Sequence, residues 1–377
     1  MNAFAQNNFT YFLILIIIMF NNIINIEYFE KLGSEVFMSV TIKDVAKLAD
    51  VSPSTVSRVI ADNPRISDAT KEKVYKAMKE MKYHPNAIAR SLVSKTTKTI
   101  GLILPNNDED LFVNPFFIQI MRGISHYAQK KGYYIMYTYS NNEDQEVEYI
   151  ASLMNSRRVD GIILPTVRKD DKCIAYLKET DYPFVVIGKP ENADEILWVD
   201  NDNFHAMYSV VNYLIQKGER KIAFIGGPPT LNVTINRLEG YTRAMENIGE
   251  KIDEDMIQAA EFTEKSGYEA MKRILSKSHP TAVVTTDDLI AFGASKAISE
   301  MKEYHKLSNH HISVVGFNNT PLAAYRNPSL SSVDINSEEL GYFAVKLLIN
   351  KLENEKENIN NYIIDTKLVE RESTQKL

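Results

Sequence analysis

Over residues 99–377, short β-branched runs alternate with stretches of helical periodicity, and this pattern limits the possible folds more than any other feature. Strands joined through helices become parallel, and helices then cover both faces of their sheet. About 280 residues are too many for one such unit of modest size, so we expect an α/β body of two lobes facing each other across a cleft. The predicted strands are 99–104, 133–139, 161–164, 184–187, 221–225, 282–285 and 312–315, and the predicted helices lie near 115–131, 143–157, 203–217, 235–248, 265–277, 288–302 and 338–353.

A different pattern precedes this body, at residues 38–85. Thr41 followed by Asp44 predicts a helix start with a capping-box variant. Ser52 before Pro53 predicts a second, short helix, and Ser67 predicts a third helix over 68–82. Two short helices around a tight turn, followed by a third, indicate a helix-turn-helix unit. The second helix would present short polar side chains and one guanidinium, Arg58, which suit phosphates and base edges.

Charge is distributed unevenly along the chain. Residues 38–98 carry 12 Lys and Arg against 6 Asp and Glu, although the whole chain has a net charge of -6. Residues 1–37 contribute -2, which leaves -10 for residues 99–377. A small basic segment on a large acidic body indicates a polyanion partner for that segment. A lysine-rich solvated helix face is the alternative explanation.

The first 37 residues differ in composition from the rest. Asn, Ile, Phe, Tyr and Lys make up 22 of them, as translated AT-rich non-coding DNA would give. The apolar run 11–20 is too short to span a bilayer as a helix, and no Lys or Arg precedes Lys31 as a signal peptide would need. We expect residues 1–37 to be a non-native or mis-annotated extension, with a membrane tether as the alternative. Cys173 is the only cysteine, which excludes an internal disulfide and fits a cytoplasmic location.

Residues 41–92 resemble the DNA-binding head and hinge of the lactose/galactose repressor family along more than fifty residues. The resemblance implies a second helix in the major groove and a hinge at residues 86–92 that enters the minor groove, where Leu92 would wedge into a base step. Residues 94–98 complete the predicted hinge and linker segment 86–98 as a polar linker. It implies DNA contacts from this set: Thr41, Ser52, Pro53, Ser54, Thr55, Ser57, Arg58, Arg65, Asn86, Ala89 and Leu92.

The body is similar to the same family at the segments VDGIIL, VDNDN, FIGGPP, RLEGY and VVGFNN. The implied fold is that of periplasmic sugar-binding proteins, with three crossings between the lobes. The implied effector residues are Phe116, Phe117, Lys189, Arg237, Asp287 and Asn318. Asp288 would instead cap the following helix. Many family members carry Asp where this chain has Asn318 and Asn319, and the neutral amide suits an uncharged sugar.

Together these features predict a cytoplasmic, sugar-responsive transcription repressor that binds a pseudo-palindromic DNA operator as a homodimer. Within the family, the chain looks most like the maltose-operon repressors of Gram-positive bacteria, which implies maltose or a related α-glucoside as effector. Two alternatives stay open: a catabolite-control-type regulator governed by a phosphorylated protein partner, and a transport-associated sugar-binding protein. Phosphate-binding glycine loops and the nucleophile-elbow motif are absent from the sequence, so we expect no enzyme activity, no cofactor, no metal site and no membrane partner.

Overall fold

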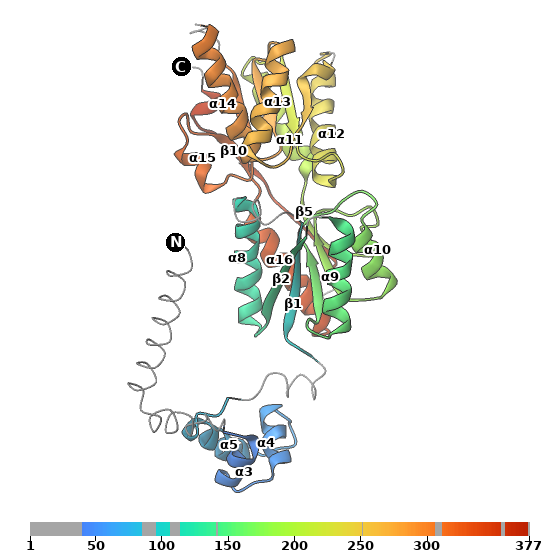
Figure 1. Cartoon of the computed structure of the whole chain (residues 1–377), viewed down its shortest axis with the longest axis vertical. Helices are drawn as coiled ribbons and strands as arrows, with labels where there is room; N and C mark the ends of the chain where they lie inside the picture. The colour runs from blue at the N-terminus through green and yellow to red at the C-terminus, as the bar shows by residue number, and fades with distance from the viewer. Residues whose placement is uncertain are drawn as a thin grey trace, which may run out of the picture. The chain divides into compact units, whose positions relative to one another are not determined.

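The computed structural model describes residues 40–84, 96–105, 114–140, 142–250, 252–305, 311–355 and 359–375. Contacts divide the chain into a small unit, Met1–Lys95, and a large one, Thr96–Leu377 (Figure 1). The expected extension 1–37 and the hinge residues Asn86, Ala89 and Leu92 lie outside the described residues. The domain boundaries 38–85, 86–98 and 99–377 therefore stay predictions.

The described part of the small unit contains three helices, α3 (Ile42–Leu48), α4 (Pro53–Ile60) and α5 (Asp68–Glu80). Their starts follow the predicted caps: the Ser52 hydroxyl accepts a hydrogen bond from the main-chain N–H of Thr55, and Ser67 does the same for Thr70. The apolar faces of the helices meet in a small core that includes Val45, Ala46, Ala49, Val56, Val59, Val74 and Ala77. The helix-turn-helix prediction is confirmed.

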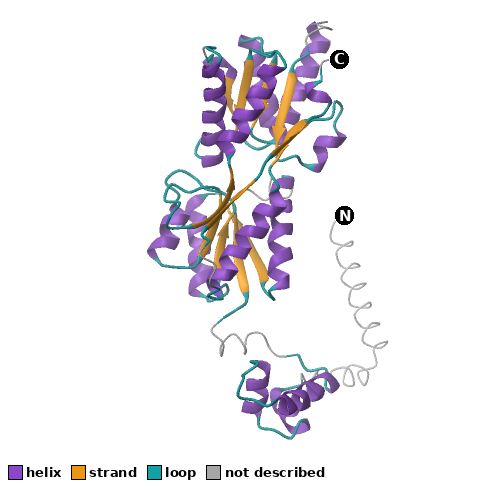
Figure 2. Ribbon diagram, turned by 180° about the vertical axis from the view of Figure 1, so that it is seen from behind, coloured by secondary structure: helices purple, strands orange, loops and turns teal. Residues whose placement is uncertain are grey.

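The large unit has two lobes, each built on a sheet covered by helices, as Figure 2 shows. The described strands of the first lobe run in the order β11-β5-β4-β3-β1-β2, all parallel. Its strands are β1 (Thr99–Pro105), β2 (Tyr134–Ser140), β3 (Gly161–Leu164), β4 (Phe184–Ile187), β5 (Leu197–Asn201) and β11 (Asn361–Ile364), and its helices are α8 (Pro115–Lys130), α9 (Glu143–Asn155), α10 (Lys172–Glu179) and α16 (Ser337–Leu352).

The second lobe repeats this plan with the described strand order β12-β10-β9-β8-β6-β7, in which only β12 is antiparallel. Its strands are β6 (Ile222–Gly226), β7 (Ile257–Ala259), β8 (Ala282–Thr285), β9 (Ser313–Phe317), β10 (Ser331–Asp334) and β12 (Lys367–Val369). Its helices are α11 (Asn203–Gln216), α12 (Asn232–Asn247), α13 (Glu264–Lys277), α14 (Asp288–His305) and α15 (Pro321–Tyr325), with short 3-10 turns η1 (Glu254–Met256) and η2 (Glu372–Thr374).

Within the described residues the chain passes between the lobes three times: after β5, after β10 and after β11. One side chain ties these passages together. The amide nitrogen of Asn201 donates to the carbonyl of Ile335 at 3.0 Å and to that of Ile364 at 2.9 Å. The three crossings implied by the resemblance are thus present, and a single buried amide holds them side by side.

The structure also adds elements that the periodicity did not predict. Strands β5, β7, β10, β11 and β12 and helices α10 and α15 were not expected. Strands β7 and β12 have only three residues, which are too few to show a period. Among the described residues, no helix is both long enough and apolar enough to cross a membrane.

Candidate DNA interface and effector pocket

Helix α4 is strongly two-sided. Val56 and Val59 are buried against α3 and α5, whereas Ser52, Pro53, Ser54 and Arg58 are exposed on the opposite side, and Thr55 and Ser57 are half-buried. The hydroxyl of Ser52 lies 2.7 Å from that of Ser54 and 2.9 Å from that of Thr55, so these groups form one polar cluster at the helix start. This face offers small donors, acceptors and one cation, which is the chemistry that DNA backbones and base edges require.

Two further predicted DNA contacts flank this helix. Arg65 is exposed in the loop before α5, and its main-chain N–H is held by the side chain of Asn63 at 2.9 Å. Thr41 is the cap residue directly before α3, and its hydroxyl donates to the carboxylate of Asp44 at 2.6 Å. The hydroxyl proton is therefore used within the protein, and the hydroxyl oxygen can still accept hydrogen bonds.

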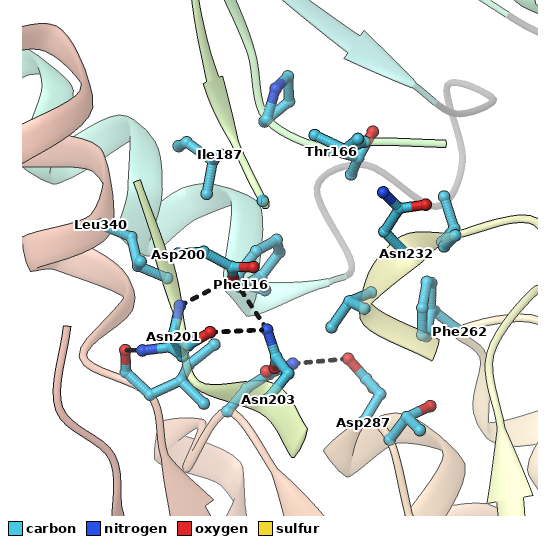
Figure 3. A pocket seen from close by; sticks show the side chains of 18 of the residues that line it. Phe116, Thr166, Ile187, Asp200, Asn201, Asn203, Asn232, Phe262, Asp287 and Leu340 are labelled. Atoms are coloured by element: carbon cyan, nitrogen blue, oxygen red, sulfur yellow. Dashed lines mark hydrogen bonds between the residues drawn. The ribbon is translucent and has the colours of Figure 1, made fainter. Parts of the chain in front are cut away.

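A pocket lies in the cleft between the two lobes (Figure 3). Five of the six predicted effector residues line it: Phe116, Phe117, Arg237, Asp287 and Asn318. The sixth does not. The side chain of Lys189 is exposed and lies over the ring of Trp198, and only the main chain of Lys189 contacts the site, where its N–H donates to Asp200 at 2.8 Å. A lysine next to a strand end has a long side chain that can leave the cleft for solvent.

Arg237 is the buried cation of the pocket, 3% exposed. Its Nε donates to the amide oxygen of Asn203 at 2.9 Å, one terminal nitrogen donates to the carbonyl of Thr286 at 2.6 Å, and its guanidinium lies 4.1 Å from the centre of the Phe317 ring. Burial lowers the pKa of this guanidinium, while nearby carboxylates raise it. These contacts use Nε and one terminal nitrogen, so the remaining N–H groups of the planar guanidinium are available to a ligand.

Asp287 also lines the pocket and is buried. It accepts hydrogen bonds from the side chain of Asn318 at 2.7 Å and from the main-chain N–H of Leu289 at 2.7 Å. Burial and the neighbouring Asp288 raise the pKa of Asp287 to about 7. The expectation that Asp288 caps α14 is wrong: Asp287 accepts the first-turn N–H, and Asp288 turns away to Ser332 and Thr320.

Sequence reasoning missed Asp200 and Asn203, which complete the polar wall. Asp200 accepts from the main-chain N–H groups of Lys189 and Asn201, and from the amide of Asn203 at 2.8 Å. Figure 3 shows the hydrogen bond from Asn203 to Asp200 at the end of β5. The amide oxygen of Asn203 accepts from Arg237 on α12, so Asn203 bridges these two charged groups. The segment VDNDN was recognised as a family marker, and its position at a strand end could have identified these side chains as pocket residues.

The apolar part of the pocket comes from both lobes. It consists of Phe116, Phe117, Pro165, Val167, Ile187, Leu231, Val233, Phe262, Ile335 and Leu340. Phe116 is half-buried and packs edge-on against Phe117, with ring centres 5.2 Å apart. Aromatic and aliphatic surface beside carboxylates, amides and a guanidinium suits a ligand with both apolar faces and hydroxyl groups, such as a sugar.

The two lobes also touch directly around this pocket. The main-chain N–H of Lys169 donates to the carbonyl of Thr230 at 2.9 Å, and that of Asn232 donates to the carbonyl of Val167 at 3.1 Å. The amide of Asn232 reaches the Lys189 carbonyl at 3.1 Å. These hydrogen bonds hold the lobes in contact along one side of the pocket.

The base of the predicted linker is fixed to the first lobe. Asp160 accepts from the main-chain N–H and hydroxyl of Thr97 at 2.7 and 2.8 Å, and from the N–H of Lys98 at 2.8 Å. The ammonium of Lys98 pairs with Glu353 at 2.7 Å. Thr97 and Lys98, which the sequence placed in the linker, are therefore bound to the lobe.

The fold and these two surfaces define a class: a DNA-binding regulator with a helix-turn-helix head and a ligand-binding body. A family model for bacterial regulatory proteins of the lacI family matches residues 41–86, and one for periplasmic binding proteins and the sugar binding domain of the LacI family matches residues 97–372. The chain belongs to the LacI family. It is a transcription regulator and not an enzyme.

Individual relatives agree with this assignment. The HTH-type transcriptional regulator MalR of Streptococcus pneumoniae is 40% identical over 343 residues, which are 89% of this chain and 100% of that protein. A LacI-type transcriptional regulator of Bacillus cereus subsp. cytotoxis is 37% identical, with a TM-score of 0.68 over 73% of this chain and 97% of that one. The lac repressor dimer bound to operator is 25% identical, with a TM-score of 0.76 over 89% of this chain and 99% of that one. Within the described ranges, no group of His, Cys, Asp or Glu side chains could hold a metal ion.

Proposed function

We propose that this chain is a cytoplasmic repressor that binds a pseudo-palindromic operator as a homodimer, and that maltose or a related α-glucoside in the cleft controls this binding. The observation that carries the proposal is the pocket between the lobes, where aromatic faces lie beside a buried Asp287, Asn318 and Arg237. Sugars need this combination, because their rings have apolar C–H faces and hydroxyl edges.

Support for the particular sugar comes from relatives. The regulators at 35–40% identity include proteins named MalR from Streptococcus pneumoniae and Staphylococcus xylosus. The uncharged Asn318 in the polar lining of the pocket also suits a neutral ligand. We propose Ser52, Pro53, Ser54, Thr55, Ser57, Arg58 and Arg65 as DNA contacts of the head, together with Thr41 and the hinge residues Asn86, Ala89 and Leu92.

The control of DNA affinity follows from the position of the pocket. A ligand that contacts both lobes changes their relative stability in the open and closed arrangements, and only this difference shifts the equilibrium. Because the linker is anchored at Asp160 on the first lobe, lobe movement reaches the head through that lobe. We expect sugar binding to release the operator.

The test is a titration of the purified protein with maltose while its binding to an operator from its own genomic neighbourhood is followed. A fall in DNA affinity at micromolar to millimolar maltose is expected. Tight operator binding that ignores maltose would overturn sugar control, and addition of a phosphorylated carrier protein would then test the alternative regulator.

A further inference from the structure

The cleft contains a second chamber beside the effector pocket. It is lined from the first lobe by residues that include Ser140, Glu146 and Arg168, and from the second lobe by residues that include Thr230, Glu261 and Thr263. Four residues line both spaces: Phe117, Thr166, Leu231 and Phe262. The two chambers therefore adjoin across a shared wall.

An ion pair forms part of the wall of this second chamber. The two terminal nitrogens of Arg168 donate to the two carboxylate oxygens of Glu146, both at 2.7 Å. The Glu146 side chain is 3% exposed and that of Arg168 is 20% exposed. The main-chain N–H of Arg168 donates to Asp171 at 3.1 Å, so the residue is also fixed at its backbone. Such a bidentate pair is rigid and is prepared before a ligand arrives.

The chemistry of this pair matches sugar hydroxyl groups. A guanidinium has five N–H donors, of which Glu146 uses two, so Arg168 keeps donors for a ligand. One Glu146 oxygen also accepts from the Cys173 thiol at 3.4 Å, which fixes the carboxylate further. Neighbouring hydroxyls on a sugar ring each donate and accept. Across the chamber, the second lobe offers the hydroxyls of Thr230 and Thr263 and the carboxylate of Glu261. Phe262, labelled in Figure 3 at the effector pocket, lines both chambers and offers an apolar surface for a ring face.

We propose that the cleft takes a two-ring sugar, with one ring in the effector pocket and the second beside Arg168 and Glu146, and that this pair selects disaccharides over monosaccharides. The inference rests on the proposed function and assigns the second chamber a role within it. A monosaccharide fills one chamber and leaves the ion pair to water. A disaccharide replaces that water with contacts to both lobes.

The experiment compares maltose with glucose by isothermal titration calorimetry on the full chain. We expect maltose to bind at least tenfold more tightly than glucose. Since removing Arg168 alone would leave Glu146 buried without a partner, the test variant is the double substitution Glu146→Gln with Arg168→Gln, which keeps volume and removes both charges. It should lower maltose affinity at least tenfold and leave glucose affinity within twofold of wild type.

A milder variant and a matched control complete the design. Thr230→Ala removes an exposed hydroxyl from the opposite wall and should lower the affinity for maltose but not for glucose. This variant tests the inference independently if the double variant fails to fold. Lys172→Ala breaks an exposed ion pair with Asp144 outside the chamber and should change neither sugar. Equal affinity for maltose and glucose in the wild type, or an unchanged ratio in both chamber variants, would overturn this inference while sugar control stands. Binding of neither sugar would instead overturn the proposed function.

Discussion

The Asp287 carboxylate lies 2.7 Å from the amide nitrogen of Asn318, and this hydrogen bond joins the start of α14 to the end of β9 at the effector pocket. Both side chains are buried, and Asn318 adopts a backbone φ of 95°, in the left-handed region. A residue held in this region by its surroundings is strained for any side chain but glycine. The surrounding structure must therefore hold Asn318 in this conformation. One such restraint is the hydrogen bond from the Asn318 main-chain N–H to the carbonyl of Val333 at 2.9 Å.

The first prediction concerns pH. The pKa of Asp287 is raised from 3.8 to about 7, so between about pH 4 and pH 7 the unfolded chain loses this proton and the folded protein keeps it. The contribution of Asp287 to stability therefore falls as pH rises through this window, by about 1.4 kcal/mol for each pKa unit. Asp287→Asn removes the titration. The difference in unfolding free energy between variant and wild type, from urea melts, should shift in favour of the variant from pH 4.5 to pH 7.5.

Asp194→Asn is the control for this experiment, because Asp194 is an exposed aspartate in a loop of the same body. Its melts should follow the wild type at every pH. A difference between Asp287→Asn and wild type that stays constant across the window would contradict the raised pKa.

The second prediction concerns DNA reading by α4. Arg58→Ala should lower the discrimination between the operator and an operator changed at one guanine, because a guanidinium that reads a base contributes about 1–3 kcal/mol of discrimination. Competition binding with the two duplexes measures this ratio. Lys76→Ala removes an equal charge from the exposed face of α5 and should leave the ratio unchanged. Unaltered discrimination in Arg58→Ala would exclude base reading by this residue.

The third prediction concerns Arg237. Arg237→Ala removes the hydrogen bonds to Asn203 and Thr286 and should abolish the response to maltose while operator binding without sugar is kept. Gel-shift titrations with and without maltose separate these two effects. The response should survive in Arg243→Ala, because Arg243 lies on the same helix with an exposed side chain. A normal maltose response in Arg237→Ala would refute its place in the effector site.

The fourth prediction concerns the crossings between the lobes. Asn201→Ala leaves the carbonyls of Ile335 and Ile364 without their side-chain donor, and each buried polar group left unpaired costs about 1–3 kcal/mol. Chemical unfolding should show a loss of this order. Asn212→Ala removes a comparable, half-buried amide of α11 that donates to the Tyr208 carbonyl one turn earlier in the same helix, and it should cost much less. Equal stability of the two variants would show that the crossings do not need this amide.

The sequence predicted the head well because its signals are local. Ser52, Pro53 and Ser67 act within one helical turn, and the structure places each at a helix start. The strands β10, β11 and β12 could not be found in this way. Strand β3 is equally short, but its sequence GIIL is an apolar run, whereas β10 reads SSVD and β12 reads KLV. Their strand structure depends on pairing with segments distant in the sequence, such as β5 for β11 and β10 for β12.

The effector pocket was predicted through family resemblance more than through pattern. That route found Arg237 and Asp287, yet it misplaced the side chain of Lys189 and gave the cap of α14 to Asp288, whereas Asp287 both lines the pocket and caps the helix. Which of two adjacent aspartates caps a helix depends on the turn geometry before it, and no spacing rule contains that geometry. Asn203 was missed because its two partners, Asp200 and Arg237, come from different lobes.

Strand β3 connects the linker base and the effector pocket within the first lobe. Its four residues begin directly after Asp160, which holds the linker base, and end directly before Pro165 and Thr166 in the effector pocket. A strand of this length spans about 13 Å and is already extended, so it cannot stretch. We therefore expect an axial shift of Thr166, imposed by a ligand, to move Asp160 and the linker base by a similar amount.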